Sequence, residues 1–277
     1  MLNFFKRRPC NKGLIKVVLE GGFGNQLFQF AVATQIAMKE RVPLSLEFKK
    51  GSRSYALDFL GLNQGTNYKV TIDAGILKFE PLLKIDKCPL IEFREKSFTY
   101  SEIKMNAKHV ELIGYFQSFK YFEEIAESLR NFILSHIAPQ AGQSNAIFIH
   151  ARLGDMALNP TSRAYHGIIS DEYVRNALET FDMPNQKIVV ITEDRKDLEK
   201  KLPWTASRAD EIQCKSLEED FRTLLSAKNL IISNSTFSWW AAWLAEAETA
   251  APKNWFTREI LQQNPIHDLI PENWRLI

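Results

Sequence analysis

Residues 234–241 read Asn-Ser-Thr-Phe-Ser-Trp-Trp-Ala, and this stretch is the most informative in the chain. It follows the apolar run 230–232 and leads into a second apolar run at 242–245, which predicts a strand, a polar turn and a buried helix. Hydroxyl groups beside the unpaired backbone N–H groups of a helix start form a ready site for phosphate. The turn therefore predicts an anion site that includes Asn234, Ser235, Thr236, Phe237 and Ser238.

The helix that follows this turn is apolar almost all the way round. Phe237, Trp240 and Leu244 follow one helical stripe, and Trp239 and Trp243 follow another. A helix with apolar residues on every side is a buried helix. We therefore expect the tryptophans to lie in the core, and an aromatic platform for a sugar is the alternative interpretation.

A second polar segment, His-Ala-Arg-Leu-Gly-Asp at 150–155, follows the predicted strand 146–149. Side chains alternate along a strand, so His150 and Arg152 emerge on one face. A guanidinium there can hold a phosphate through two hydrogen bonds, and His150 can bond a base or a ribose. The alternative is an ion pair between Arg152 and Asp155 that closes the turn.

A third polar segment contains Gly22, Phe23, Gly24 and Asn25, between the predicted strand 14–20 and a helix. Glycine allows a sharp turn and a close approach of the backbone to a ligand. The segment also resembles a dinucleotide fingerprint, with Glu47 at the end of the next strand as the ribose carboxylate. Leu27 stands at the third glycine position and weakens that interpretation, and a turn that binds nothing is a further alternative.

Strands and helices alternate along the chain, which predicts an α/β protein with parallel sheets and crossover helices. Ligands of such sheets bind beyond the carboxyl ends of the strands, where all three polar segments lie. The segment 138–144 is typical of a linker and divides the chain into domains 1–140 and 141–277. The stretch 51–106 shows mixed short runs and turn signals, and its pattern does not define a succession of strands and helices. The predicted elements are strands at 14–20, 43–48, 146–149, 187–191 and 230–232, and helices at 119–137, 171–181 and 217–228.

Composition excludes several classes of protein. The 277 residues are 45% hydrophobic and 25% charged with a net charge of +2, which is ordinary for a globular protein and does not favour nucleic acid. No apolar run approaches the roughly 20 residues that span a bilayer, and the basic start lacks the apolar stretch of a signal peptide. Three scattered cysteines suit a reducing compartment, so we expect a cytoplasmic protein. Lys6, Arg7 and Arg8 indicate a solvated terminus or a weak contact with anionic lipid at the inner face of the membrane.

Five segments together resemble the inverting α-1,2-fucosyltransferases, in the right order and over nearly the whole chain. They lie at 21–31, 114–122, 150–155, 234–244 and 251–256. The resemblance implies a GT-B-like fold, in which two Rossmann-like domains with parallel sheets face each other across a cleft. It also implies an acceptor-side domain at 1–140 and a GDP-sugar-binding domain at 141–277.

The resemblance also implies substrates and residue roles. Fucose would pass from GDP-fucose to a terminal galactose of an oligosaccharide or lipid-linked glycan, such as an O-antigen, without a metal or other cofactor. Arg152 would hold the β-phosphate, and Asn25 would approach the pyrophosphate from the other domain, so both are expected to be catalytic. The turn at 235–237 would bind phosphate, while His150, Glu193 and Asp194 would lie near the nucleoside.

The chain departs from the family pattern in places. Leu153 replaces a second arginine, Met156 replaces a common tyrosine, and a usual Ser-Asp-Asp strand end is Thr-Glu-Asp at 192–194. These changes leave the acceptor open. The general base is also open, with Asp155 and His166 as candidates. Two rival functions remain: a nucleotide-dependent oxidoreductase that uses Glu47, and a non-catalytic glycan- or nucleotide-binding protein.

Overall fold

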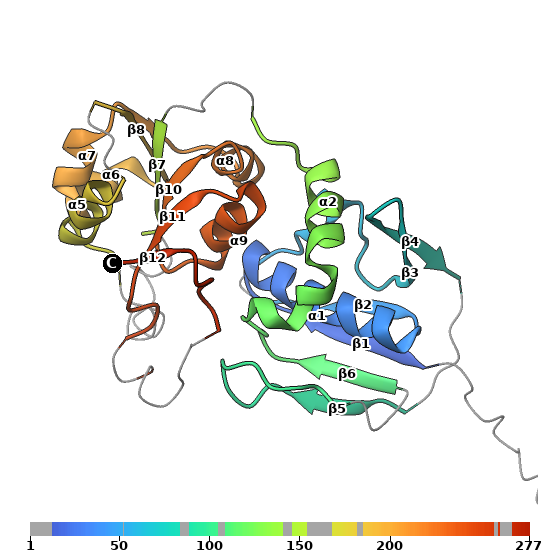
Figure 1. The fold of residues 1–277 in the computed structure, drawn as a ribbon. Coiled ribbons are helices and arrows are strands. Elements are labelled where there is room, and N and C mark those ends of the chain that lie inside the picture. The colour runs from blue at the N-terminus through green and yellow to red at the C-terminus, as the bar shows by residue number, and fades with distance from the viewer. Residues whose placement is uncertain are drawn as a thin grey trace, which may run out of the picture.

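A computed structural model of the protein describes residues 13–51, 53–83, 89–104, 109–140, 146–153, 168–181, 185–257, 260 and 268–277. Within these ranges the strands form two six-stranded sheets, one before and one after the predicted linker (Figure 1). The basic residues Lys6, Arg7 and Arg8 and most of the linker lie outside the described residues. The boundary between domains 1–140 and 141–277 therefore stays a prediction.

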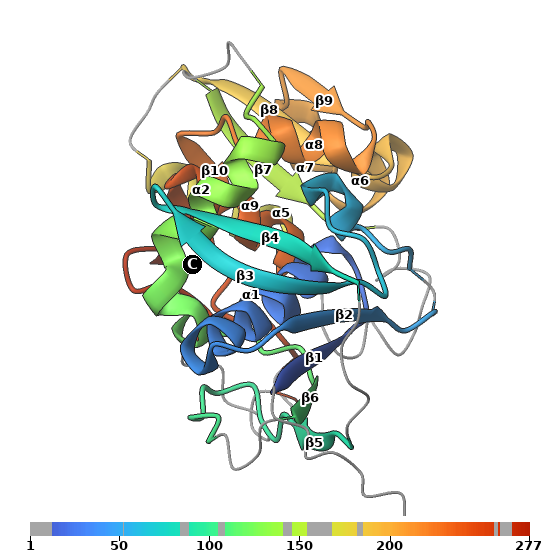
Figure 2. The same ribbon diagram turned by 90° about the vertical axis from the view of Figure 1, so that its right-hand side faces the viewer.

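The first sheet has the strand order β4-β3-β2-β1-β6-β5. Its centre is parallel, because β1 pairs in parallel with β2 and β6 and β5 pairs in parallel with β6. At one edge β3 is antiparallel to both β2 and β4 (Figure 2). The expectation of a parallel sheet is therefore wrong for this edge. The bounds are β1 (Leu14–Leu19), β2 (Leu44–Phe48), β3 (Asn67–Asp73), β4 (Ile76–Leu82), β5 (Ile91–Arg94) and β6 (His109–Ile113).

The helices of this half are α1 (Phe23–Glu40), α2 (Ala126–His136) and the short 3-10 helices η1 (Leu57–Leu60) and η2 (Phe119–Ile125). The single helix predicted over 119–137 is divided, because the backbone at Phe122 leaves helical geometry with φ −135° and ψ 20°. Its predicted apolar face is confirmed, since the five residues that define it are buried: Phe122, Ile125, Leu129, Phe132 and Ile133.

The second sheet is parallel throughout and has the order β12-β11-β10-β7-β8-β9. Every residue of β7 is buried because helices cover both faces of the sheet. The strands are β7 (Ala146–Ala151), β8 (Lys187–Thr192), β9 (Glu211–Gln213), β10 (Asn229–Ile231), β11 (Glu248–Ala251) and β12 (Arg275–Leu276). The helices are α5 (Asp171–Glu179), α6 (Arg195–Lys201), α7 (Pro203–Arg208), α8 (Leu217–Leu224) and α9 (Thr236–Ala245).

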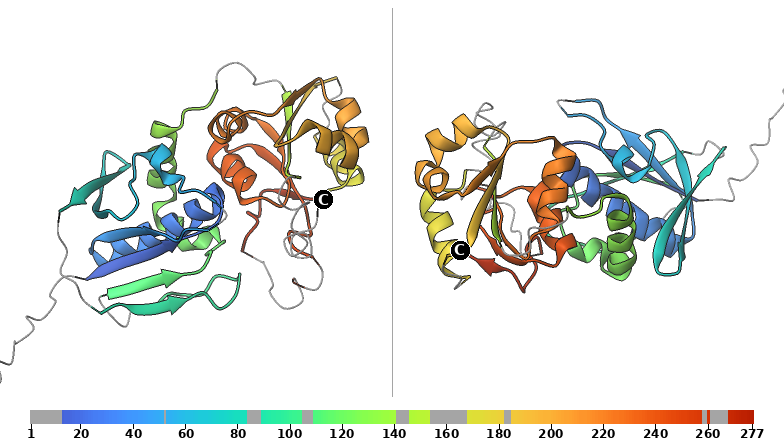
Figure 3. Two further views of the ribbon diagram at one scale, coloured as in Figure 1. Left: turned by 180° about the vertical axis from the view of Figure 1, so that it is seen from behind. Right: turned by 90° about the horizontal axis from the view of Figure 1, so that it is seen from above.

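One apolar core runs through both halves of the protein, because α1 of the first half packs against α9 of the second (Figure 3). The ring of Phe28 lies 4.6 Å from that of Trp239 and 5.0 Å from that of Trp240. Both tryptophans are fully buried, as predicted, whereas Trp243 is partly exposed and lies under the guanidinium of Arg130. The contact brings together the turns that precede α1 and α9.

None of the helices in the described part of the chain combines the length and hydropathy that crossing a bilayer requires.

Candidate functional site

Two helix N-termini meet where the carboxyl ends of β1 and β10 approach each other. Gly22 precedes α1 and has no side chain to cap it, and Ser235 precedes α9 without a side-chain cap. A Cβ atom at Gly24 would lie 2.6 Å from the backbone nitrogen of Phe237, so only glycine allows this approach. Both helices therefore present uncapped N–H groups and positive dipole ends close together, which favours an anion.

Asn25 connects the two halves at this point. Its Oδ1 accepts hydrogen bonds from Thr236 Oγ1 at 2.9 Å and from Gln117 Nε2 at 3.0 Å. Because the amide oxygen takes both donors, the Nδ2 group faces the Gly21 turn, where an added Cβ would lie only 2.7 Å away. The backbone of Gly21 has a φ of +79°, which also favours glycine.

Arg152 and His150 lie against the same turn from the neighbouring strand β7. Arg152 Nη1 donates to Ser235 Oγ at 3.4 Å, and His150 Nδ1 lies 3.1 Å from Ser233 Oγ. The His150 ring is also 5.4 Å from the ring of Phe237. Both side chains therefore emerge on the α9 face, as alternation along the strand predicted. The guanidinium of Arg152 lies at the start of α9.

The two basic side chains of this site, His150 and Arg152, differ in their charge near pH 7. Burial lowers the pKa of His150 to about 3, and the positive charge of Arg152 acts in the same direction. His150 is therefore neutral near pH 7. The positive potential at the turn comes from Arg152 and from the two helix ends.

Glu193 and Asp194 have structural partners after β8. Glu193 Oε2 accepts a hydrogen bond from the backbone N–H of Leu153 at 3.1 Å and so holds the end of β7. Asp194 Oδ1 caps α6, accepting from the backbone nitrogens of Lys196 at 2.7 Å and Asp197 at 3.1 Å. A contact of either carboxylate with a nucleoside stays a prediction.

The remaining predicted residues shape the turn before α9. Asn234 Nδ2 donates to the carbonyl of Trp255 at 3.2 Å, and Ser238 Oγ donates to the carbonyl of Ser235 at 3.2 Å. The hydroxyl of Ser238 therefore serves the helix start itself. Asp155 and His166, the candidate bases, lie outside the described residues.

Sequence reasoning assigned no role to Gln26 and Gln29, which are fully buried in the first turns of α1. Gln26 Nε2 donates to the carbonyls of Gly21 and Ser54 at 2.9 Å, and Gln29 Oε1 accepts from Glu20 N at 2.9 Å. The two side chains therefore hold the turn that precedes the helix. Polar side chains inside an apolar helix were the available signal, because buried polar groups need partners.

The two features that suggested a dinucleotide fingerprint serve packing and charge pairing within the protein. Gly24 is required by the contact with α9. Glu47 forms an ion pair with Lys16, which also pairs with Glu111 at 2.8 Å. Neither residue needs a bound dinucleotide to account for it.

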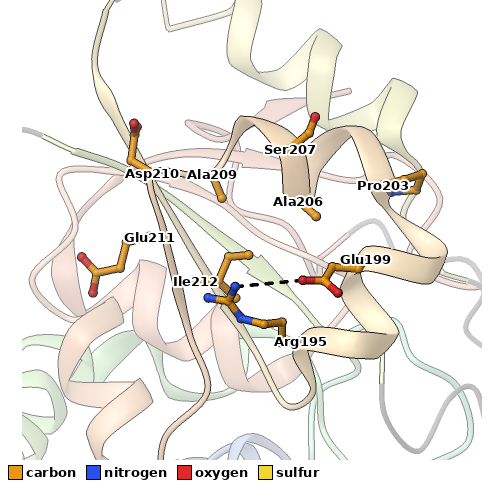
Figure 4. Close-up of a pocket in the computed structure, with 9 residues that line it drawn as sticks. All are labelled: Arg195, Glu199, Pro203, Ala206, Ser207, Ala209, Asp210, Glu211 and Ile212. Carbon is orange, nitrogen blue, oxygen red and sulfur yellow. Dashed lines mark ion pairs between the residues drawn. The ribbon is translucent and has the colours of Figure 1, made fainter.

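A cavity of 580 Å³ lies away from these residues, between α6, α7 and β9 (Figure 4). Arg195 and Glu199, one turn apart on α6, form an ion pair at 4.0 Å on its wall. None of the predicted site residues lines it, so it is separate from the candidate site. Within the described ranges, no cluster of three or more His, Cys, Asp and Glu side chains is placed to hold a metal ion.

The chain is similar to known glycosyltransferases. The model of glycosyl transferase family 11 matches residues 90–277. An α-1,2-colitosyltransferase of Escherichia coli is 30% identical over 92% of this chain and 96% of its own length. The E. coli O-antigen biosynthesis glycosyltransferase WbnK is 26% identical over 86% and 93%. The structure of E. coli heptosyltransferase WaaC with ADP aligns with a TM-score of 0.52 at 9% identity, over 95% of this chain and 92% of that one, and shows a shared GT-B fold.

Proposed function

Because the chain belongs to glycosyl transferase family 11, we propose that it transfers L-fucose from GDP-fucose to the 2-hydroxyl of a terminal galactose in a surface glycan, with inversion. One observation carries the proposal: the Arg152 guanidinium and the uncapped starts of α1 and α9 converge on one point. That arrangement suits the pyrophosphate of a nucleotide sugar.

The transfer needs stabilisation of a departing nucleoside diphosphate. Negative charge grows on the β-phosphate as its bond to the sugar carbon weakens, and fixed cations and N–H donors stabilise that charge most in the transition state. Arg152 would supply the cation, and the start of α9 would supply the N–H donors. Asn25, held by Thr236 and Gln117, would offer its amide Nδ2 from the other half.

We further propose that no metal ion takes part, because Arg152 and the two helix dipoles can offset the diphosphate charge. Asp155 and His166 remain the candidate proton acceptors for the galactose 2-hydroxyl. Neutral His150 is buried against Ser233 and would contact the donor as a hydrogen-bonding group rather than as a cation.

A second donor has a specific observation in its favour. One relative, 30% identical over 92% of this chain, bears the name α-1,2-colitosyltransferase. Colitose lacks one ring hydroxyl that fucose carries. GDP-fucose and GDP-colitose therefore differ at a single position of the sugar. A GDP-colitose donor with the same α-1,2 linkage is therefore the alternative.

The test is direct. The purified protein is incubated with GDP-fucose or GDP-colitose and a panel of β-galactosyl acceptors, and the product linkage is determined by NMR. We expect an α-1,2-linked product, and stabilisation by GDP but not by NAD in thermal-shift titrations. Stabilisation by NAD alone would favour the oxidoreductase. GDP binding with no transfer to any acceptor would favour a non-catalytic binding protein.

A further inference from the structure

The turn after β6, residues 114–117, follows a strand that lies next to the one leading into α1. β6 pairs in parallel with β1, so the turns after the two strands lie side by side (Figure 1). The strand order reverses between β1 and β6, and open α/β sheets bind ligands at such a point. The segment 114–122 also carries part of the family resemblance. Both observations indicate that this turn contributes to the site.

The backbone of this turn is strained at Phe116. Its φ is +52°, a left-handed conformation that bulky side chains rarely adopt. The ring of Phe116 is nevertheless fully buried, with its centroid 6.4 Å from that of Phe93 and 5.5 Å from that of Tyr121. Such conformations persist only where the surrounding contacts impose them, and they occur often at functional sites. The contacts that impose this one therefore indicate the purpose of the turn.

Glu95, the residue after β5, holds the turn in this conformation. Its Oε2 accepts hydrogen bonds from the backbone nitrogens of Tyr115 at 2.7 Å and Phe116 at 3.0 Å. Its own backbone N–H donates to the carbonyl of Ile113 at 2.9 Å. Gly114 is required beside it, because an added Cβ would lie 2.4 Å from Glu95 Cβ. One carboxylate oxygen therefore fixes two successive N–H groups of the turn.

The conformation of the turn determines the position of Gln117. This side chain is buried, and its Nε2 donates to Asn25 Oδ1 at 3.0 Å. The carbonyl of Gly114 accepts from Gln29 Nε2 at 2.9 Å, which ties the turn to α1, the helix that carries Asn25. Because Gln117 and Thr236 both donate to the amide oxygen of Asn25, its Nδ2 is the group presented to a ligand.

We propose that Glu95 is a positioning residue for the transfer reaction, an inference that rests on the proposed function. It holds the turn that places Gln117, and Gln117 orients the amide of Asn25 so that Nδ2 faces the diphosphate. Glu95 acts through these neighbours and does not itself contact the substrate. Such an effect is expected because groups at a reacting centre work only within a narrow range of positions.

Two substitutions at Glu95 separate an acceptor oxygen from a negative charge. Glu95→Ala leaves the two N–H groups without their acceptor, whereas Glu95→Gln keeps the length of the side chain and one acceptor oxygen. Burial raises the pKa of Glu95, while its bonds to the two backbone N–H groups act in the opposite direction. Because burial disfavours the charge, an uncharged amide is a suitable replacement.

The first experiment measures kcat and KM for GDP-fucose with a β-galactosyl acceptor, at temperatures below the unfolding midpoint of each variant. Glu95→Ala should lower kcat by about 10–100-fold, the range for a misplaced catalytic group. Glu95→Gln should recover most of the wild-type kcat. Glu92→Ala, at an exposed glutamate on β5, is the matched control and should leave kcat unchanged.

A double-mutant cycle with Asn25→Ala distinguishes positioning from a general loss of stability. If Glu95 acts through Asn25, adding Glu95→Ala to Asn25→Ala should lower kcat no further, because residues that act as a unit are not additive. Independent effects, in which the double variant shows the product of the two losses, would overturn the proposal. So would a Glu95→Gln variant as slow as Glu95→Ala.

A measurement without substrate tests the position of Asn25 directly. Its side-chain amide signals in proton–nitrogen NMR spectra are assigned by their loss in Asn25→Asp. They should move in Glu95→Ala and keep their positions in Glu95→Gln and Glu92→Ala. Unchanged signals in Glu95→Ala would overturn the proposal.

The same spectra separate this proposal from the proposed function. Moved Asn25 signals, in a protein whose wild type transfers no sugar from GDP-fucose, would reject the proposed function and leave the positioning of Asn25 standing. If Glu95→Ala does not fold, Glu95→Asp takes its place in each measurement. Its shorter side chain withdraws the carboxylate from the two N–H groups while it keeps the charge.

Discussion

The turn before α1 and the turn before α9 start alike and differ in what they supply. Each follows a strand, lacks a capping side chain and opens a helix. The first is held by buried glutamines and admits its neighbour through the missing side chain of Gly24. The second carries hydroxyl groups and receives the guanidinium of Arg152. The turn before α1 therefore contributes close packing, and the turn before α9 contributes hydroxyl groups and positive charge.

This difference separates two contributions that glycosyl transfer requires. The close approach of the two halves is a packing property, so a substitution that disturbs it should lower the stability of the fold. A cation at the leaving group is an electrostatic property, and its loss should affect turnover while the fold is retained.

Replacing Arg152 with alanine should lower turnover by about 10²–10³-fold, the effect of removing a dedicated oxyanion donor. The thermal midpoint of the variant shows how much of any loss comes from stability rather than from the leaving-group charge. Steady-state kinetics and thermal unfolding would be measured together, with Arg94→Ala as a control at an exposed arginine paired with Glu92. Turnover near that of the wild type would reject the role of Arg152.

Gly24→Ala should destabilise the protein by about 1–3 kcal/mol, because the added methyl group overlaps the backbone of Thr236 and Phe237. Gly22→Ala is the matched control for stability, since a Cβ there meets no atom within 4 Å and its φ of −76° suits any residue. Urea unfolding of both variants would measure the difference. Equal midpoints would mean that the two helices do not approach as described.

The stability of the protein should depend on pH through His150, which lies on β7 against the turn before α9. Its pKa is about 3 in the folded protein and 6.5 in the unfolded chain, so the unfolded chain binds the extra proton between these values. The contribution of His150 is therefore complete above about pH 6.5 and is lost as the pH falls toward 3, by on the order of 1 kcal/mol per pH unit. Urea midpoints from pH 4.5 to 7 should show a shallower slope for His150→Gln than for the wild type. Parallel slopes would contradict a buried neutral histidine.

Thr236→Val should have the smallest effect, about 1 kcal/mol of stability, because it removes one hydrogen bond to Asn25 and keeps the shape of the side chain. Thr236→Ser, which keeps the hydroxyl, should retain most of the wild-type stability. Thermal unfolding of the pair would show the contribution of this bond between the halves. A Thr236→Ser variant as unstable as Thr236→Val would assign the effect to the methyl group instead.

Much of the fold was accessible from sequence because its signals were local. In the second sheet β7, β8 and β10 are short apolar runs between helices, and they lie within two residues of the predicted positions. The β3–β4 hairpin was not predicted, because its residues are largely half-exposed and show no consistent apolar face. The break at Phe122 was also invisible, since the apolar spacing continues across it.

The site was predictable as a set of polar strand ends and less so as a set of partners. Alternation along β7 correctly placed His150 and Arg152 on one face. The bond between Gln117 and Asn25 joins residues 92 positions apart, and no local pattern reports such a pair. Asp194 lies directly before α6 and caps it through its carboxylate. The family resemblance does not distinguish such a cap from a contact with a ligand.

The shared core of α1 and α9 has a consequence for engineering specificity by exchanging halves between relatives. Phe28 belongs to one half, yet its contacts with Trp239 and Trp240 belong to the other. A hybrid joined at the linker would place foreign surfaces against each other where α1 packs on α9. Successful chimeras should therefore transplant the two helices as a unit, with the fusion points chosen around that pair.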